Sequence, residues 1–254
     1  MTQLDTASVS MVSEFSAQIY NALRDVDIVD SHLDATDFFG TDFVFLSGLF
    51  HRYEVQGFAG ICLLHKHSLV DRNEVMVQVL AKAADGDDQL VTSPMTRTDQ
   101  GYAAAKPWSF MARSDSSVSC LRPIEYALDR CVLSDYSTLM ENPEFLREFA
   151  EYVTLRSLNA HIGLALIRRV FPAGPEGTIL LEEIDESRRH NTRRFVDERV
   201  LNGRKTIQTV YPLEELDVIE PACTPVCVPI ARCLDLSPGH GRETSHEGQH
   251  GHSA

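Results

Sequence analysis

The stretch GFAGICLLHKH, residues 57–67, decides how the rest of the chain is interpreted. Its apolar residues occupy both alternating positions up to Leu64, which is typical of a central strand buried on both faces. Such a strand needs neighbours, and residues 75–79 (VMVQV) predict the adjacent one, with a turn at residues 85–88. Further short strands are predicted at residues 108–111, 123–126, 178–182 and 205–211.

Helices are expected on either side of these strands. Residues 10–25 place Val12, Phe15, Ile19 and Leu23 at helical spacing, which predicts an amphipathic first helix. The triplet Asn142-Pro143-Glu144 has the composition of a helix start. The apolar pattern that follows it in the chain predicts a helix running toward Leu166. Residues 38–48 fit either a strand or a buried helix. The irregular mixture predicts an α+β fold, with a mixed or antiparallel sheet and two to three packing helices.

The predicted organisation is one domain followed by a tail. At 254 residues, with 43% hydrophobic and 24% charged residues, the composition is that of an ordinary globular protein. Residues 1–220 are expected to form a single α+β domain. From residue 221 the composition shifts to Pro, Cys, Gly and His, so residues 221–254 are expected to be a flexible tail, largely disordered after about residue 236.

The charge balance disfavours a nucleic-acid partner. The formal net charge is −14, and the densest basic stretch, residues 188–194, has acidic neighbours on both sides and is interpreted as a solvated face. We expect no membrane span, because no apolar run approaches about 18 residues. The first twenty residues lack the apolar core of a secretory signal, so a cytoplasmic protein with reduced thiols is expected.

An H-E-x-x-H motif lies at the end of the chain, from His246 to His250. In zinc proteases this motif requires a stable helix that holds both histidines on one face. Gly248 lies inside the motif and Gly251 follows it, each costing a helix about 1 kcal/mol relative to Ala. We therefore interpret this segment as a His-rich tail that binds metal only loosely, and reject the protease reading.

The first cluster that predicts chemistry is His65 with His67. Side chains alternate along a strand, so these two imidazoles are expected to share a face at the strand's end, as two ligands for Zn²⁺, Fe²⁺ or Mn²⁺. The alternation Asp30-Ser31-His32-Leu33-Asp34 after Ile28-Val29 suggests where further ligands come from, with His32 as a candidate metal ligand and Asp30 as a candidate catalytic residue. The competing interpretation makes His65 a core histidine, His67 the first exposed residue after the strand, and Asp30 and Asp34 turn or cap residues.

The second cluster lies in the tail. Cys223 and Cys227 are spaced so that both thiolates can bind one tetrahedral ion, and Cys233 or His240 would complete the coordination. A closed Cys/His site of this kind is structural rather than catalytic. The alternative is that these cysteines are buried or redox-paired thiols.

Other catalytic signatures are missing from the sequence. It contains no G-x-S-x-G elbow, no phosphate-binding G-x-x-x-x-G-K-[ST] and no dinucleotide fingerprint, so no nucleotide cofactor is expected. The acidic run Glu182, Glu183, Asp185, Glu186 offers a general base, although a solvated strand end is the simpler interpretation.

The segment from Gly60 to His67, followed by Asn73-Glu74-Val75-Met76-Val77, resembles a family of uncharacterised fungal proteins. Their strands follow the pattern G-V-x-L-L-H-x-H-F with E-x-L-V just after, and Ser68 stands here in place of the Phe. Residues 123–126 and the Cys-containing tail near Gly239-His240 are similar too. The resemblance implies a eukaryotic cytosolic protein near specialised metabolism, and implies no particular activity.

Together these patterns predict a metal-binding protein that processes a small molecule, an accessory enzyme of specialised metabolism with His65 and His67 lining the pocket. Its cofactor would be Zn²⁺ or another divalent transition metal. Two alternatives stay open. One is a non-enzymatic interaction domain with a structural zinc clip in the tail. The other is cofactor-free acid–base catalysis, with Asp30 or Glu74 orienting a histidine base. Protein partners are left unspecified.

Overall fold

The computed structural model describes residues 12–115, 118–167, 177–201, 206–213 and 225–227. The helices are α1 (Ala17–Asn21), α2 (Val26–Ala35), α3 (Asp42–Arg52), α4 (Arg130–Met140) and α5 (Pro143–Leu155), with 3₁₀ turns η1 (Gln100–Ala104) and η2 (Glu198–Leu201). The strands are β1 (Ala59–Leu63), β2 (Glu74–Lys82), β3 (Asp88–Thr96), β4 (Lys106–Asp115), β5 (Val118–Ala127), β6 (Ile162–Leu166), β7 (Thr178–Asp185), β8 (His190–Asp197), β9 (Ile207–Gln208), β10 (Val210–Pro212) and β11 (Pro225–Cys227).

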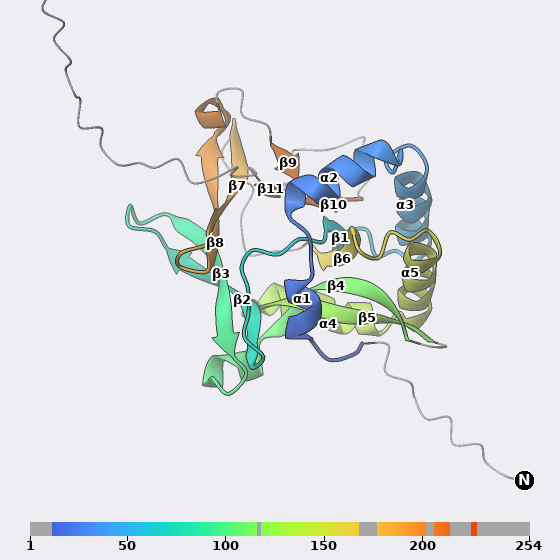
Figure 1. Ribbon diagram of the computed structural model, residues 1–254, viewed down its shortest axis with the longest axis horizontal. Coiled ribbons are helices and arrows are strands. Elements are labelled where there is room, and N and C mark those ends of the chain that lie inside the picture. Colours follow the sequence, from blue (N-terminus) through green and yellow to red (C-terminus); the bar gives the residue numbers. More distant parts are fainter. Residues whose placement is uncertain (1–11, 116–117, 168–176, 202–205, 214–224, 228–254) are drawn as a thin grey trace, which may run out of the picture.

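All these strands belong to one sheet, in the order β10-β1-β6-β4-β5-β2-β3-β8-β7-β11-β9. The first and last strands of this order, β10 and β9, are separated in the chain only by Thr209. The backbone N–H of Leu63 at the end of β1 donates to the carbonyl of Thr209 over 2.8 Å. The sheet therefore curls until its two ends meet at residues 207–212, and side chains from distant strands can face one interior (Figure 1).

The predicted fold class is confirmed in its coarse form. The sheet is mixed, because β2 pairs with β5 and β11 with β7 in parallel, whereas the other pairs are antiparallel. The expected number of helices is wrong, since the described residues form five α-helices where two to three were predicted.

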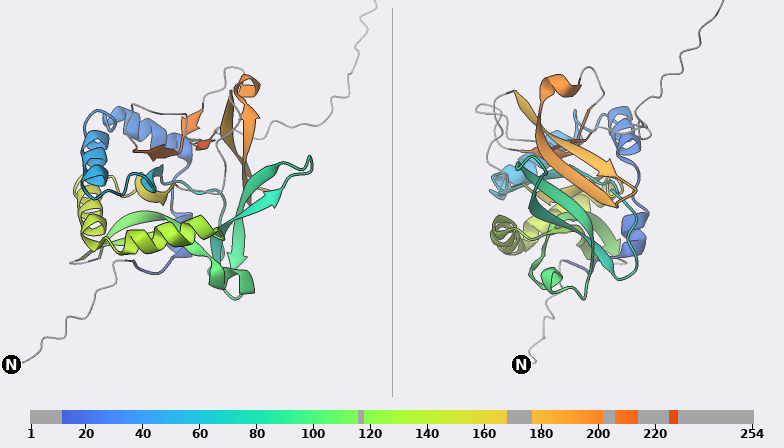
Figure 2. Two further views of the ribbon diagram at one scale, coloured as in Figure 1. Left: turned by 180° about the vertical axis from the view of Figure 1, so that it is seen from behind. Right: turned by 90° about the vertical axis from the view of Figure 1, so that its left-hand side faces the viewer.

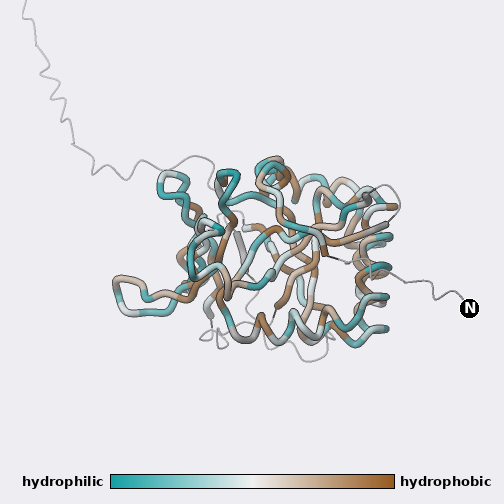
Figure 3. Tube along the Cα trace, turned by 90° about the horizontal axis from the view of Figure 1, so that it is seen from below, coloured by the Kyte–Doolittle hydropathy of each residue, from teal (hydrophilic) through white to brown (hydrophobic). Residues whose placement is uncertain are grey.

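The helices lie on one part of the sheet. α4 and α5 pack on β4, α5 also contacts β5, and α3 packs on α5, while α2 contacts β1 and β9. Figure 2 shows the β2–β3 and β7–β8 hairpins projecting at the end of the molecule away from α3 and α5. In Figure 3 hydrophobic stretches run through the middle of the molecule, whereas loop tips are largely hydrophilic.

An aromatic cluster fixes α3 and α5 against each other. The rings of Phe50 and Phe145 meet edge to face with centroids 4.9 Å apart, and Phe149 lies beside both. All three side chains are fully buried. Burial of one such ring stabilises the fold by about 1.5–3 kcal/mol, so this cluster anchors the helical layer.

β1 confirms the buried central strand, because all five of its residues are buried. Its predicted neighbour is wrong, since β1 pairs with β6 and β10, and β2 pairs with β3 and β5. Local patterning identifies a strand, but the pairing partner is chosen by packing across the whole molecule.

The predicted first helix is much shorter than expected. Val12 forms a bridge to Leu121, and the N–H of Ser13 donates to the carbonyl of Leu121 over 2.8 Å, so this segment lies extended along β5. Ser16 then caps the single-turn α1, accepting from the N–H of Ile19. Of the four apolar residues at helical spacing, Phe15 and Leu23 are buried and Val12 and Ile19 are half-buried. At Val12 and Ser13 the backbone pairs with β5 and not with a helical turn.

The helix predicted from Asn142 begins as expected and ends early. α5 stops at Leu155, and Ser157 adopts a left-handed backbone conformation with φ of 58°. That reversal ends the helix, and the apolar run toward Leu166 becomes β6 instead. Of the segment at residues 38–48, residues 42–48 belong to α3, and residues 38–41 form the turn before it.

The part of the chain that the structure describes contains no helix of sufficient length and apolarity to cross a bilayer. Within the predicted tail, β11 pairs with β7 and β9 and so joins the sheet.

Candidate metal centre

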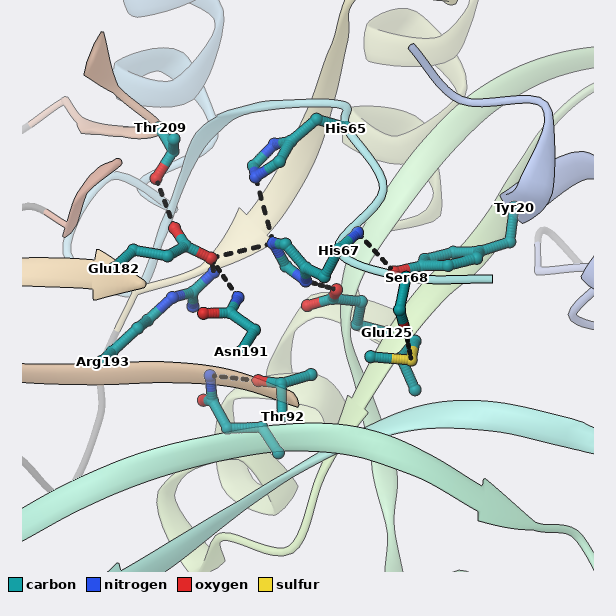
Figure 4. Close-up of polar contacts among 12 residues, drawn as sticks. Tyr20, His65, His67, Ser68, Thr92, Glu125, Glu182, Asn191, Arg193 and Thr209 are labelled. Atoms are coloured by element: carbon teal, nitrogen blue, oxygen red, sulfur yellow. Dashed lines mark hydrogen bonds and ion pairs between the residues drawn. The ribbon is translucent and has the colours of Figure 1, made fainter. Parts of the chain in front are cut away.

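His65 and His67 lie in the buried segment that follows β1, and their exposed fractions are 6% and 4%. The segment is fixed by its backbone, because the N–H of Leu64 donates to the carbonyl of His161 over 2.8 Å. The N–H of His67 donates to the hydroxyl of buried Tyr20 over 3.1 Å. The two rings meet edge to face, with their Nε2 atoms 3.0 Å apart (Figure 4). The sequence prediction that these imidazoles converge is therefore correct, although a loop rather than a pleated strand aims them.

Each of the two histidines has its Nδ1 occupied by a neighbouring acceptor. Nδ1 of His65 lies 3.0 Å from the carbonyl oxygen of Leu63, which can only accept, so this nitrogen carries the proton. Nδ1 of His67 lies 2.7 Å from a carboxylate oxygen of Glu125 on β5. Metal-binding histidines are typically oriented in this way, by a carbonyl or a carboxylate on the nitrogen that does not bind the metal. Both Nε2 atoms are left facing one point.

Glu182 on β7 brings a carboxylate to the same point. Its Oε1 lies 2.8 Å from Nε2 of His67, and the side chain is fully buried. The same oxygen accepts from Arg193 over 2.9 Å and from Asn191, while the other oxygen accepts from the hydroxyl of Thr209 over 3.3 Å. These donors fix the carboxylate between β8 and the segment joining β9 to β10, so its position does not depend on the histidines alone.

The environment drives the two histidines to opposite protonation states. Burial, followed by the positive charge of His67, lowers the pKa of His65 to about 4. Burial alone would also lower the pKa of His67, but the carboxylates of Glu125 and Glu182 outweigh it and raise that pKa to about 9. Although burial opposes ionisation, Arg193 and His67 hold the pKa of Glu182 well below its usual value. In the metal-free protein at neutral pH, His67 is therefore a cation that donates from Nε2 toward His65 and Glu182.

The spacing of the three ligand atoms also fits a single ion. Nε2 of His65, Nε2 of His67 and a carboxylate oxygen of Glu182 all lie within 4.8 Å of one another. Two ligands bound at about 2.1 Å to a tetrahedral ion lie about 3.4 Å apart, so the 3.0 and 2.8 Å separations found here would open by about half an ångström around an ion. A divalent ion that replaces the His67 proton therefore requires a small outward shift of the ligands.

A cavity of about 20 Å³ adjoins the cluster. It is lined by Cys62, Leu63, Leu64, His65, His67, Trp108, Ser109, Ile124, Glu125, Arg193, Thr209 and Val210. One water needs about 10–15 Å³ on this measure. The cavity therefore accommodates a water or a very small ligand, and is far below the size of an organic metabolite.

His32 and Asp30 are not brought into this cluster. Both lie on α2, where residues two apart point in different directions, so the predicted strand alternation at residues 30–34 is wrong. The ring of His32 instead stacks on His161, with centroids 3.8 Å apart. Asp30 and Asp34 lie near Tyr211, where their charges add to burial in raising the pKa of the phenol.

The second predicted cluster is mostly outside the described residues. Cys223, Cys233 and His240 lie there, as does the H-E-x-x-H segment. Cys227 ends β11, opposite Glu182 of β7. Outside the tail, Cys62 and Cys120 are buried thiols.

Sequence reasoning missed three of the residues that build the site. Glu182 was interpreted as part of a solvated acidic run and Arg193 as part of a solvated basic one, yet the two form a buried ion pair. Glu125 lay within a predicted strand without a role. Glu74, suggested as the residue orienting a histidine base, pairs instead with Arg189. The one available signal was that Glu182 and Arg193 each sit within a strand pattern, where alternate residues face inward.

Comparisons of this chain with protein-family models, with curated proteins and with solved structures give no match. Function is therefore inferred from the side chains of the site and their geometry.

Proposed function

We propose that this protein binds one divalent transition metal ion, such as Zn²⁺, Fe²⁺ or Mn²⁺, through His65, His67 and Glu182. The observation that carries the proposal is the orientation of the two imidazoles. Their Nδ1 atoms are held by Leu63 and Glu125, so both Nε2 atoms meet beside the carboxylate of Glu182. Two histidines and one carboxylate form a ligand set that these metals accept.

We further propose that the metal is catalytic and acts on a small molecule. Three protein ligands leave at least one coordination position open, where a metal polarises a bound group or activates water. The adjoining cavity of about 20 Å³ supports a water-sized ligand at that position. In line with the resemblance to fungal proteins near specialised metabolism, the reaction is proposed to belong to an accessory step of such chemistry.

A second candidate is acid–base catalysis without a metal. The observation that favours it is the separation of the two histidine pKa values, about 4 for His65 and about 9 for His67. Paired groups with pKa values pushed apart are typical of an acid and a base acting together. In this case His67 would be the acid and His65 the base.

Metal content separates the two candidates. We would purify the full chain without an affinity tag, load it with Zn²⁺, dialyse it and measure metal per chain by elemental analysis. Wild-type protein is expected to retain about one ion, which the Glu182→Gln variant and the His65→Ala/His67→Ala double variant lose. Glu183→Gln is the matched control, because Glu183 is the next residue on β7, with an exposed side chain.

Cys223→Ala identifies metal that is held by the predicted tail cluster. If the ion is lost with Cys223→Ala and kept with Glu182→Gln, the proposed centre is wrong and the structural zinc clip is supported. If the wild-type protein retains no ion at all, metal-free acid–base chemistry is the remaining candidate.

A further inference from the structure

The helices α3 and α5 form one end of the molecule, away from the β2–β3 and β7–β8 hairpins (Figures 1 and 2). Phe50 contacts Phe145 at one end of the pair, and Asp42 contacts Arg156 at the other, so the two helices run antiparallel. Among the described residues, no helix or strand lies on their outer side in either figure. This outer side is therefore accessible to a partner.

Apolar and aromatic side chains gather on this outer side. Val44 and Leu155 are 63% and 83% exposed, and Phe45 is 48% exposed. The ring of Phe45 stacks on Tyr152 with centroids 4.0 Å apart and an interplanar angle of 11°, which joins the two helices. Gly48 lies one turn from Val44, and a Cβ at Gly48 would meet nothing within 4 Å. We call these five residues the α3–α5 face.

A contiguous exposed group of this kind indicates an interaction surface, whereas single exposed apolar residues are common. Val44 and Phe45 are neighbours in the chain, Phe45 contacts Tyr152, and Tyr152 and Leu155 are three residues apart on one helix. The face is therefore continuous across both helices.

Charged side chains at the rim of the α3–α5 face form ion pairs. The pairs are Arg52 with Glu148, Arg147 with Glu151, and Arg156 with Asp42. Because the chain has a formal net charge of −14, two copies repel each other, and they repel least where positive side chains accompany the negative ones. A two-fold interface brings a surface against itself, so the arginines of one copy can face the carboxylates of the other. This rim therefore favours a second copy of the chain as the partner.

The dimensions of the face limit the strength of the contact. α3 and α5 have 11 and 13 residues, so they are about 16–20 Å long, and two helices side by side are about 20 Å wide. The area covered on each copy is then roughly 400 Å², about half of the ~800 Å² per partner in a stable interface. We therefore expect weak association, with a Kd on the order of 10–100 µM.

We propose that this chain forms a weak two-fold dimer through the α3–α5 face. Phe45, Tyr152, Val44 and Leu155 form the centre of the contact, and the three ion pairs form its rim, which is the usual composition of a protein interface. Gly48 lets the helices of two copies approach closely. The dimer is independent of the metal centre, whose ligands come from β7 and the segment after β1.

The test measures the mass of the full-length protein in solution. Sedimentation equilibrium at about 1 to about 500 µM covers the expected Kd. Wild-type protein is expected to pass from the chain mass of 28.4 kDa to twice that mass, without larger species. Val44→Glu and Leu155→Glu should each weaken dimerisation at least about tenfold, because each would place an unpaired carboxylate in the contact.

Val200→Glu is the matched control. Val200 lies in η2, away from the α3–α5 face, and is 62% exposed, so it adds the same charge at a position as exposed as Val44. Its dimerisation should stay within about twofold of wild type, because no contact is lost and one added charge changes the overall repulsion little. Circular dichroism checks that each variant is folded, which the exposure of all three side chains leads us to expect.

Three results would overturn the proposal. The first is a wild-type protein that stays monomeric at the highest concentration, and the second is a mass that grows beyond two copies. The third is equal weakening by Val44→Glu and Val200→Glu, which would place the contact elsewhere. If a monomeric wild-type protein binds phosphatidylcholine vesicles and Val44→Glu does not, the face belongs to a lipid surface and the dimer is wrong.

Discussion

His65 and His67 are two residues apart in the chain and have opposite electrostatic surroundings. His65 donates to a neutral carbonyl and lies beside a cation, whereas His67 lies between two buried carboxylates. The same side chain type is therefore neutral at one position and charged at the other. A charged His67 contacts both Glu125 and Glu182, and Glu182 also pairs with Arg193.

A titration of the metal-stripped protein tests this assignment. The pKa of His67 is raised to about 9, against about 6.5 in the unfolded chain. Its protonation should therefore stabilise the fold fully below about pH 6.5, and this contribution should be lost as the pH rises toward 9. NMR of the imidazole carbons should show His67 titrating near pH 9 and His65 near pH 4. A His67 midpoint near 6.5 would contradict the pairing with Glu125 and Glu182.

The sequence identified the histidines but not their partners, for a physical reason. In residues 178–183, TILLEE, the alternation of a strand places Glu182 with Leu180 and Glu183 with Leu181. Each of these two faces carries a leucine, so the pattern does not tell which glutamate is buried. That choice is made by Arg193 and Asn191 on β8, which compensate the charge of Glu182. Compensation of a buried charge is a property of the folded pair and is not visible in one strand.

At the scale of the helices and strands, residues typical of a helix start were more informative than the spacing of apolar residues. The start of α5 was predicted correctly, because Pro143 at the first helical position and Glu144 in the first turn are local signals, although the Asn142 side chain makes no capping hydrogen bond. α2 was missed, although its buried residues Val26, Val29 and Leu33 follow helical spacing. The polar residues at 30–34 also alternate as they would in a strand. When a short segment fits both the helical and the strand pattern, tertiary packing decides which structure forms.

Because β6 packs closely against β4, we expect the substitution of one glycine on β6 to destabilise the fold. A Cβ at Gly163 would overlap the carbonyl of Phe110 and lie 2.7 Å from a methyl group of Leu64. Gly163→Ala is therefore expected to lower the free energy of unfolding by about 2–3 kcal/mol, because a backbone carbonyl cannot move aside without separating β4 from β6.

Gly48→Ala is the control for this substitution. Gly48 lies in α3, where an added Cβ meets nothing within 4 Å. The variant should gain about 0.5–1 kcal/mol from helix propensity. Urea denaturation measures both variants, and a Gly163→Ala protein as stable as wild type would refute the close approach.

At the scale of the whole molecule, the α+β class followed from composition and patterning, but the closed strand order did not. Closure depends on β9 and β10, which are two and three residues long and carry little signal of their own. Their pairing with β11 and β1 is long-range, and local sequence does not encode it. The site was unpredictable for the same reason, since its side chains come from β5, β7, β8 and the segment after β1.

Metal binding is expected to stabilise the whole fold, because the ligands join segments far apart in the chain. A ligand at 100 times its Kd adds about 2.7 kcal/mol to the free energy of unfolding. For a chain of this size that corresponds to a rise in Tm of about 5–10 °C. Thermal unfolding monitored by circular dichroism, with and without Zn²⁺, measures the shift. Glu182→Gln should lose the shift and Glu183→Gln should keep it; an equal shift in both variants would place the stabilising ion elsewhere.

The meeting of the sheet's two ends at Thr209 has a consequence for the order in which a newly made chain matures. The carbonyl of Thr209 accepts a hydrogen bond from the N–H of Leu63, and its hydroxyl donates one to Glu182. Thr209 therefore joins the segment that carries the histidines to the carboxylate. A ribosome-bound chain that has emerged only as far as η2 carries both histidines and Glu182 but lacks the strand that closes the ring. Binding of an ion at the proposed site would therefore come late in folding, after the other strands of the sheet have paired.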